Sequence, residues 1–332
     1  MIPALVLTAG LATRLRPLSL VRAKAALPVA AEPLVGRILR GLVASGVRDV
    51  VLNLHHLPAS ITGRIGDGSA YGVRVRYSWE TPVLGSAGGP RRAAPLLGTS
   101  TFLIVNGDTL TSVNLDALVE HHRRSGALIT MAGAPHAEPE KYGGIVADDQ
   151  GRVRGFVRPG ASQPSSHFVG VQVVEAAAFD SVPPDTPVES VWGLYPTLLA
   201  ARPDCVRLFR TNSRFSDIGT PTDYLAAALR LAAVDRATHG LVDDVVDNLV
   251  DNGVYGVRTV VDPTAVIDAS LLWDDVVVEA GVTVHGCIVT DGVRLPAGST
   301  WRGATVRVAS GSLCPEERLV GDLAVGPLGP AT

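Results

Sequence analysis

The residues with the clearest chemical potential lie near the start of the chain. An apolar run over residues 3–8 leads into a turn of small residues that carries Thr13, Arg14 and Arg16, and Lys24 follows ten residues after Arg14. Small residues let backbone N–H groups approach phosphate oxygens, and guanidinium groups bind phosphate through paired, charge-assisted hydrogen bonds. The pattern therefore predicts a loop that grips the phosphates of an anionic ligand.

Two isolated carboxylates occur much later, each in a distinctive setting. Asp108 follows a predicted buried strand and Gly107, which allows close backbone approach, while Asp217 precedes a predicted helix that Thr220 is placed to cap. Two carboxylates from separate segments suit Mg²⁺, which takes one or two carboxylates together with substrate phosphates. With the N-terminal cations, they predict a nucleoside triphosphate held for attack at phosphorus.

Alternating strand and helix signals position these residues. Buried apolar runs predict strands, and apolar residues spaced by three and four predict helices. The expected strands are 3–8, 49–54, 73–77, 101–105 and 127–131, and the expected helices are 33–45, 114–125 and 221–235. Such alternation predicts an α/β fold with a mainly parallel sheet, whose ligand crevice lies at the carboxyl ends of the strands.

The last part of the chain has a different period. Apolar residues recur every six positions at Val260, Val266, Leu272, Val278 and Val284, and a second row follows at Thr264, Ser270, Val276, Val282 and Ile288. Hexapeptide repeats build a β-helix in which each hexad forms one side of a coil, with about eighteen residues to a coil. An irregular all-β tail is the alternative. We expect a catalytic domain over 1–235, a connector over 236–258 that includes the acidic stretch 242–251, and a β-helix cap over 259–325.

Composition narrows the classes of function. The 332 residues are 46% hydrophobic and 18% charged, which is typical of a folded globular protein. A net charge of −3 without a basic run gives no reason to expect nucleic acid as a partner. No apolar stretch approaches the ~20 residues that span a bilayer, and the first residues do not resemble a signal peptide. The three widely spaced cysteines are read as ordinary reduced thiols, so we expect a cytoplasmic protein without a membrane partner.

Five motifs, in order along the chain, resemble those of the sugar-1-phosphate nucleotidylyltransferases, also called nucleotide-sugar pyrophosphorylases, and in particular the mannose-1-phosphate guanylyltransferase-like members. The first motif is the family's signature Gly-Gly-x-Gly-Thr-Arg-Leu-x-Pro-Leu followed by a Pro-Lys-Pro element, to which residues 9–18 and 23–25 are similar. The remaining motifs are the base loop at 84–89, Gly107-Asp108, Tyr142-Gly143 and the Asp-Ile-Gly-Thr-Pro segment at 217–221.

The resemblance implies a Rossmann-like nucleotidyltransferase domain followed by a short left-handed β-helix, which often mediates homo-oligomers in the family. It implies transfer of a nucleoside monophosphate from a nucleoside triphosphate to a sugar 1-phosphate, with Mg²⁺ as cofactor and pyrophosphate as product. GTP and mannose 1-phosphate, or a related sugar phosphate, are the expected substrates. A catalytically silent homologue that binds a nucleotide-sugar for regulation is the alternative.

Residue roles follow from the same resemblance. Arg14 would bind the departing phosphates, Lys24 would neutralise charge at the α-phosphate, and Asp108 with Asp217 would hold Mg²⁺. The nucleotide-binding residues would be Ala9, Gly10, Ala12, Thr13, Glu80, Gly85, Ser86 and Gly88. The sugar-phosphate residues would be Tyr142, Gly143 and Arg158.

The chain also departs from the family's pattern. Ala9 and Ala12 replace two loop glycines, and a left-handed backbone at Ala12 would cost roughly 1–2 kcal/mol. Both prolines that flank Lys24 in the family are absent. The family's acidic sugar contact is absent, either by substitution with Val157 or by a one-residue deletion, and Phe168 stands where an asparagine is expected. The identity of the sugar is therefore the least predictable property.

Sequence pattern alone predicts the positions of several other side chains. We expect His121 and His122 on a solvated helix face, and one of His55 and His56 is a candidate for the crevice because both follow a strand end. Trp79, Trp192 and Tyr195 are expected in the core. A dehydrogenase is excluded because the first loop lacks a Gly-x-Gly-x-x-Gly fingerprint.

Overall fold

The computed structural model describes residues 1–30, 32–239 and 253–329. The chain forms two compact units, one made of Met1–Gly10 with Val35–Ser216 and the other of Leu11–Leu34 with Asp217–Thr332. The segment that carries Arg14 and Lys24 thus belongs to the same unit as the C-terminal part. The three-part domain division expected from sequence stays a prediction, and the acidic stretch 242–251 lies outside the described residues.

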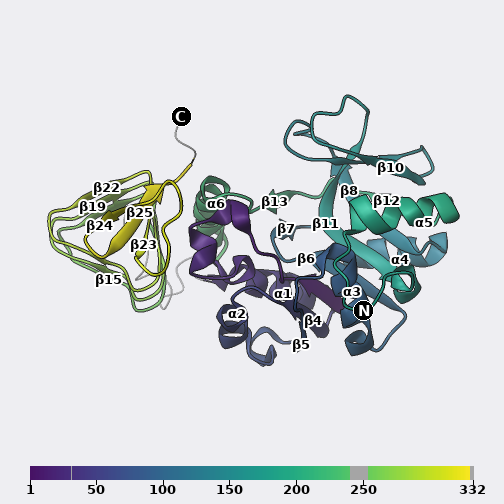
Figure 1. Cartoon of the computed structure of the whole chain (residues 1–332), viewed down its shortest axis with the longest axis horizontal. Helices are drawn as coiled ribbons and strands as arrows, with labels where there is room; N and C mark the ends of the chain where they lie inside the picture. The colour runs from purple at the N-terminus through teal and green to yellow at the C-terminus, as the bar shows by residue number, and fades with distance from the viewer. Residues whose placement is uncertain (31, 240–252, 330–332) are drawn as a thin grey trace. The chain divides into compact units, whose positions relative to one another are not determined.

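A nine-stranded sheet forms the centre of the first unit (Figure 1). Its strands are β1 (Ala4–Leu7), β4 (Asp49–Leu54), β5 (Arg74–Trp79), β6 (Thr101–Asn106), β8 (Ile129–Pro135), β9 (Gly144–Ala147), β10 (Val153–Val157), β11 (Ser166–Glu175) and β12 (Val206–Arg210). Strands β6, β1, β4 and β5 run parallel in that order, and β11 joins them to the antiparallel β9, β10 and β8. The mainly parallel α/β fold expected from sequence is confirmed.

Helices flank this sheet. They are α1 (Leu34–Ala44), α2 (Pro58–Ile65), α3 (Gly85–Leu97), α4 (Leu115–Ser125) and α5 (Tyr195–Ala201), with shorter turns at Ser69–Tyr71, Ala176–Phe179 and Ser190–Leu194. Helix α3 packs against β1 and β4, and α4 packs against β8, β11 and β12. Asn114 begins α4 by accepting a hydrogen bond of 3.0 Å from Ala117 N. A buried cluster that includes Leu5, Phe102 and Ile104 fixes the strands whose ends carry the candidate site.

The second unit begins with a compact, turn-rich segment. It contains three short 3₁₀ turns at Thr13–Leu15, Leu18–Leu20 and Lys24–Ala26, followed by the small strands β2 (Pro28–Val29) and β3 (Glu32–Pro33). Helix α6 (Pro221–His239) packs against β2, and Thr220 caps it by accepting a hydrogen bond of 3.1 Å from Asp223 N. The predicted cap is therefore confirmed.

Short parallel strands build a β-helix in the rest of the second unit (Figure 1). One side contains the parallel strands β14 (Val254–Tyr255), β17 (Leu271–Leu272), β20 (Ile288–Val289) and β23 (Ala304–Val308), followed by β25 (Leu323–Pro327) and β24 (Arg318–Val320), which pair antiparallel. The second side contains β15 (Val260–Val261), β18 (Val277–Val278) and β21 (Arg294–Leu295), and the third contains β16 (Val266–Asp268), β19 (Thr283–His285) and β22 (Thr300–Arg302). The handedness of the coil stays a prediction.

The length of each coil corrects the strict six-residue period. Val260 pairs with Val277 and Val266 pairs with Thr283, so equivalent residues are 17 apart rather than about eighteen. One of the three sides is one residue shorter than a hexad. As a result the predicted inward row is wrong at its start, because Val260 and Val266 are 60% and 52% exposed, whereas Val278 is buried.

Among the described residues, no helix combines the length and the apolar character needed to cross a membrane.

Candidate functional site

The end of β1 is tied to the end of β4 by Thr8 and Asn53. Thr8 N donates to Asn53 Oδ1 at 2.6 Å, and the Thr8 hydroxyl donates to the Asn53 carbonyl oxygen. Ala9 is buried directly after this pair and Gly10 is exposed. The first part of the predicted phosphate loop is therefore held rigidly at the carboxyl end of the sheet.

The following turn contains the left-handed residue that the sequence left open. Ala12 has φ 49° and ψ 46°, a conformation that costs an L-residue roughly 1–2 kcal/mol. Leu15 N donates to Ala12 O at 3.0 Å, which closes the 3₁₀ turn that carries Thr13 and Arg14. Leu15 is buried while Thr13 and Arg14 are exposed. The turn thus keeps a glycine-like backbone and presents its cation outward.

Lys24 lies in a second tight turn without its flanking prolines. Ala26 N donates to Ala23 O at 2.8 Å and Leu27 N donates to Lys24 O at 3.1 Å. Ala23, Ala25 and Ala26 are all buried. Burial and hydrogen bonding therefore fix the backbone that carries Lys24.

Glu80 supports the predicted base loop from beneath. Its side chain is buried, and its Oε1 accepts from Asn53 Nδ2 at 2.7 Å while its Oε2 accepts from Leu84 N at 2.8 Å. His55 Nδ1 lies 2.9 Å from the Glu80 carbonyl oxygen. The Glu80 carboxylate thus accepts hydrogen bonds from within the protein, and it shapes the loop by holding the backbone of Leu84.

Glycines give the beginning of α3 its close packing. A Cβ on Gly88 would lie 2.5 Å from Thr186 O, and a Cβ on Gly89 would lie 2.7 Å from Glu80 Oε1. Gly85 has φ +75°, which favours glycine.

Ser86 is engaged within the protein. Its hydroxyl donates to Glu189 Oε2 at 2.8 Å, and Ser190 N donates to Ser86 Oγ at 2.8 Å. Its side chain therefore ties the base loop to the turn before α5.

Asp108 follows a glycine that has no room for a side chain. A Cβ on Gly107 would lie 2.4 Å from Leu7 O, and Gly107 N donates to that oxygen at 3.0 Å. Asp108 is half-buried, and its Oδ1 accepts a hydrogen bond of 3.1 Å from Thr109 Oγ1. The strand β7 (Thr109–Thr111) then pairs with β13 (Phe215–Asp217), which ends at the other predicted metal ligand, Asp217.

The donor set suits a hard cation bound together with its substrate. Asp108 supplies carboxylate oxygens, which Mg²⁺ prefers. Among the residues described, no group of three or more His, Cys, Asp or Glu side chains could hold a metal ion. Mg²⁺ needs no such group when substrate phosphates and water complete its coordination, so the chemistry of Asp108 fits the expected ion.

The predicted Tyr-Gly element lies in a cluster of aromatic and imidazole rings that the sequence analysis missed. The centroid of the Tyr142 ring is 4.8 Å from that of His167, which stacks on Phe215 at 4.1 Å. His136 Nε2 lies 3.2 Å from the Gly143 carbonyl oxygen. Burial, with a smaller contribution from His136, lowers the pKa of His167 to about 4. No periodic signal marks this cluster, because its members come from separate strands and loops.

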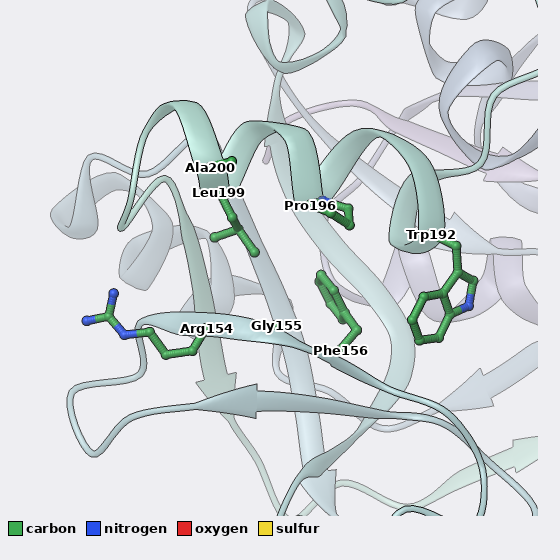
Figure 2. A pocket seen from close by; sticks show the side chains of 7 residues that line it. All are labelled: Arg154, Gly155, Phe156, Trp192, Pro196, Leu199 and Ala200. Atoms are coloured by element: carbon green, nitrogen blue, oxygen red, sulfur yellow. The ribbon is translucent and has the colours of Figure 1, made fainter.

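Arg158 stacks on an exposed tryptophan. Its guanidinium carbon lies 4.5 Å from the centroid of the Trp192 ring, and Trp192 is 48% exposed. Trp192 borders a shallow groove of about 430 Å³ between β10 and α5 (Figure 2). The groove is lined by Arg154, Gly155, Phe156, Trp192, Pro196, Leu199 and Ala200.

Among the side chains assigned by pattern, the core positions of Trp79 and Trp192 and the solvated position of His122 are wrong, and the core position of Tyr195 is confirmed. Trp192 and Trp79 are exposed, whereas His122 is buried and its Nδ1 lies 2.8 Å from Thr130 Oγ1. Tyr195 is buried as predicted and donates to Gln172 Oε1 at 2.8 Å. The π-helical turn Ser190–Leu194 is wider than an α-turn, which places Trp192 away from the core.

Comparison with known proteins identifies the family. Residues 3–234 match the family model described as nucleotidyl transferase, and the chain belongs to this family. It is 30% identical over 304 residues to the mannose-1-phosphate guanylyltransferase of Mycobacterium tuberculosis, with 90% of this chain and 82% of the relative covered. It is 36% identical over 188 residues to the N-acetylmuramate alpha-1-phosphate uridylyltransferase of Neisseria meningitidis serogroup B, with 54% and 78% covered.

A solved structure agrees in fold. HddC from Yersinia pseudotuberculosis, crystallised with GMP-PN, superimposes with a TM-score of 0.62 at 22% identity, covering 70% of this chain and all of that one. The family resemblance inferred from the five motifs is confirmed, and the activity is that of a sugar-1-phosphate nucleotidyltransferase.

Proposed function

We propose that the protein transfers GMP from GTP to mannose 1-phosphate, or to a closely related sugar 1-phosphate, and releases pyrophosphate. One observation carries this choice of substrates. The chain is 30% identical to a mannose-1-phosphate guanylyltransferase over 90% of its length, whereas it is 26% identical to a UTP–glucose-1-phosphate uridylyltransferase over 93%. The higher identity over a comparable length therefore supports the guanylyltransferase.

In the proposed reaction, a phosphate oxygen of the sugar 1-phosphate attacks the α-phosphorus of GTP in line. The new P–O bond forms as the bond to the β-phosphate breaks, and pyrophosphate leaves with the electron pair. Exposed Arg14 binds the departing phosphates, and Lys24 neutralises the charge that develops around the α-phosphorus. Asp108 and Asp217 hold Mg²⁺, which when bound orients the phosphates and offsets their charge.

The proposed base pocket uses backbone rather than side chains. We assign the edge of the base to backbone groups of Gly85 and Ser86, because Ala87 N and Gly88 N already donate to Val188 O at 2.9 and 3.3 Å. Ser86 and Glu80 are engaged within the protein and fix the shape of this backbone. In the sugar half, Tyr142 and Gly143 bind the sugar and Arg158 binds its phosphate after leaving Trp192.

The test is pyrophosphate release by the purified protein with Mg²⁺, measured over a matrix of nucleoside triphosphates and sugar 1-phosphates. We expect GTP with mannose 1-phosphate to give the highest kcat/KM. A different productive pair would correct the base or the sugar. Tight nucleotide-sugar binding without release from any pair would replace the proposal with a regulatory role.

Variants test the proposed roles. Asp108→Ala and Asp217→Ala should each lower kcat by at least about a thousandfold with an unchanged circular dichroism spectrum. Asp116→Ala, at an exposed position of α4, is the matched control and should retain full activity. An unchanged rate in either site variant would remove that carboxylate from the metal site.

Self-association through the β-helix is a further proposal, which light scattering tests.

A further inference from the structure

Arg22 is a buried cation two residues before Lys24. Its side chain is 3% exposed, and it lies in the second unit with the β-helix. Its Nη2 donates to Asp274 Oδ2 at 2.6 Å, its Nε donates to Asp291 Oδ2 at 2.6 Å, and a further bond joins Nη2 to Asp291 Oδ1. A bidentate guanidinium–carboxylate pair fixes both the position and the orientation of the cation.

The two carboxylates come from neighbouring coils of the β-helix. Asp274 and Asp291 are one 17-residue coil apart, and Asp274 N donates to Asp291 Oδ1 at 3.1 Å. Trp273 completes the site, since its buried ring lies 5.1 Å from the Arg22 guanidinium carbon. The regular coil therefore supplies two anions and an aromatic face at one place.

A second contact holds the other side of the Lys24 turn. The Tyr224 hydroxyl donates to the Pro28 carbonyl oxygen, and Tyr224 is completely buried. The Tyr224 ring meets Trp273 edge-on, with centroids 6.3 Å apart. Trp273 thus contacts both the cation before Lys24 and the tyrosine that binds the chain after it.

The short path from Arg22 to Pro28 transmits these contacts to Lys24. Ala23, Ala25, Ala26 and Leu27 are buried, and the turn is closed by its own backbone hydrogen bonds. A displacement of Arg22 therefore has to move the backbone of Lys24, because the intervening residues pack without room to absorb it.

We propose that Arg22, Asp274, Asp291 and Trp273 are positioning residues through which the β-helix sets the location of the Lys24 amino group. This inference rests on the proposed role of Lys24 in nucleotidyl transfer. The β-helix is then a part of the catalytic apparatus, because the cation at the α-phosphate is aligned from the C-terminal coils.

The chain offers a direct readout of this alignment. Lys24 and Lys141 are its two lysines, so competitive acetylation with an amine-selective reagent, quantified by mass spectrometry, reports Lys24 against an internal reference in the other unit. The variants are Asp291→Asn and Asp274→Asn, which keep side-chain shape and remove one charge each. Asp291→Asn also keeps an oxygen that can accept from Asp274 N.

Asp275→Asn is the matched control. Asp275 lies next to Asp274 and binds Arg258 through two hydrogen bonds of 2.6 and 2.7 Å, but this pair is exposed. Asparagine also tolerates the positive φ of 60° at this position. The control therefore removes a β-helix ion pair without touching the segment that carries Lys24.

We expect Asp291→Asn to change the acetylation rate of Lys24 relative to Lys141 by about threefold or more and to lower kcat about tenfold, with a smaller change in the KM for the nucleotide. Asp275→Asn should change neither. Equal changes at Lys24 and Lys141 would indicate general loosening and overturn the proposal, as would an unchanged Lys24 rate. An altered Lys24 rate with wild-type kcat would also overturn it.

The proposed function can fail separately. A wild-type protein without nucleotidyl transfer, but with a Lys24 rate that responds to Asp291→Asn and not to Asp275→Asn, would refute the activity assigned to Lys24 while confirming that the β-helix positions it.

Discussion

Asn53 donates a hydrogen bond of 2.7 Å from Nδ2 to Glu80 Oε1, and both side chains are buried. Asn53 Oδ1 accepts from Thr8 N, and Glu80 Oε2 accepts from Leu84 N. One buried pair therefore joins the end of β1 to the loop before α3, which are the segments assigned to the phosphates and to the base.

Replacing Glu80 tests the importance of this pair. In Glu80→Ala, Asn53 Nδ2 and Leu84 N lose their buried acceptor, so the free energy of unfolding should fall by about 2–4 kcal/mol, measured by urea denaturation. The KM for the nucleotide should rise because the loop at Leu84 loosens. Glu80→Gln keeps one acceptor oxygen and should lose about half as much. A loss below about 0.5 kcal/mol in Glu80→Ala would show that the pair contributes little.

Two glycine-to-alanine changes separate close packing from helix propensity. Gly88→Ala should lower the melting temperature and weaken nucleotide binding, because its Cβ meets Thr186 O at 2.5 Å. Gly63→Ala in α2 has nothing within 4 Å of the new Cβ, so it should stabilise the protein by about 0.5–1 kcal/mol. Differential scanning calorimetry gives both values. Equal effects at the two positions would contradict the assigned role of Gly88.

The left-handed backbone of Ala12 in the phosphate turn predicts that glycine stabilises the protein at this position. Ala12→Gly should raise the free energy of unfolding by up to about 1 kcal/mol, because relief of the left-handed strain exceeds the extra entropy of glycine in the unfolded chain. Ala226→Gly, at an exposed position in α6, should instead lose about 1 kcal/mol. Chemical denaturation decides, and a destabilised Ala12→Gly would mean that the alanine methyl contributes packing that outweighs the strain.

His167 makes stability depend on pH in a defined range. Its pKa is lowered from 6.5 to about 4, chiefly by burial and also by His136, and its Nδ1 has no hydrogen-bond partner among the described residues. Between these values the unfolded state binds a proton that the folded state excludes. Stability therefore falls as the pH drops from 6.5 to 4, and this group contributes no further loss below that range.

The change His167→Phe should remove this dependence. At 1.4 kcal/mol per unit of pKa difference, the variant should recover about 2–3 kcal/mol of the loss that wild type shows between pH 6.5 and 4. Urea denaturation at several pH values measures the slope, to which His122, whose pKa burial also lowers, still contributes. An identical slope in wild type and variant would refute the role of His167.

Sequence patterns correctly predicted the helices and strands that depend on residues within a single segment. The expected helix 33–45 corresponds to α1 (Leu34–Ala44), and the expected strand 49–54 is β4. The motifs likewise located the loops at the ends of β1 and β6, because small residues and a strand–Gly–Asp order are visible in the sequence.

Other features depend on partners that a single segment does not contain. His122 is buried because Thr130 and Glu175, from two strands, lie within 2.8 and 3.2 Å of its ring nitrogens. Arg22 carries no motif of its own, since its two carboxylates lie 252 and 269 residues away. Val260 was wrongly predicted to point inward because one side of each coil has five residues instead of six. A strict six-residue period does not reveal this difference.

The 17-residue coil also sets how the C-terminal part can change in length. Removing one complete coil returns each strand to the register of its predecessor, whereas removing eighteen residues turns every following inward side chain toward solvent. Insertions and deletions that preserve the fold should therefore come in multiples of 17 residues. A change that leaves Asp274 and Asp291 separated by a number of residues other than 17 would break their shared contacts with Arg22, even if the coil re-formed. The length of the β-helix can therefore change only by whole coils.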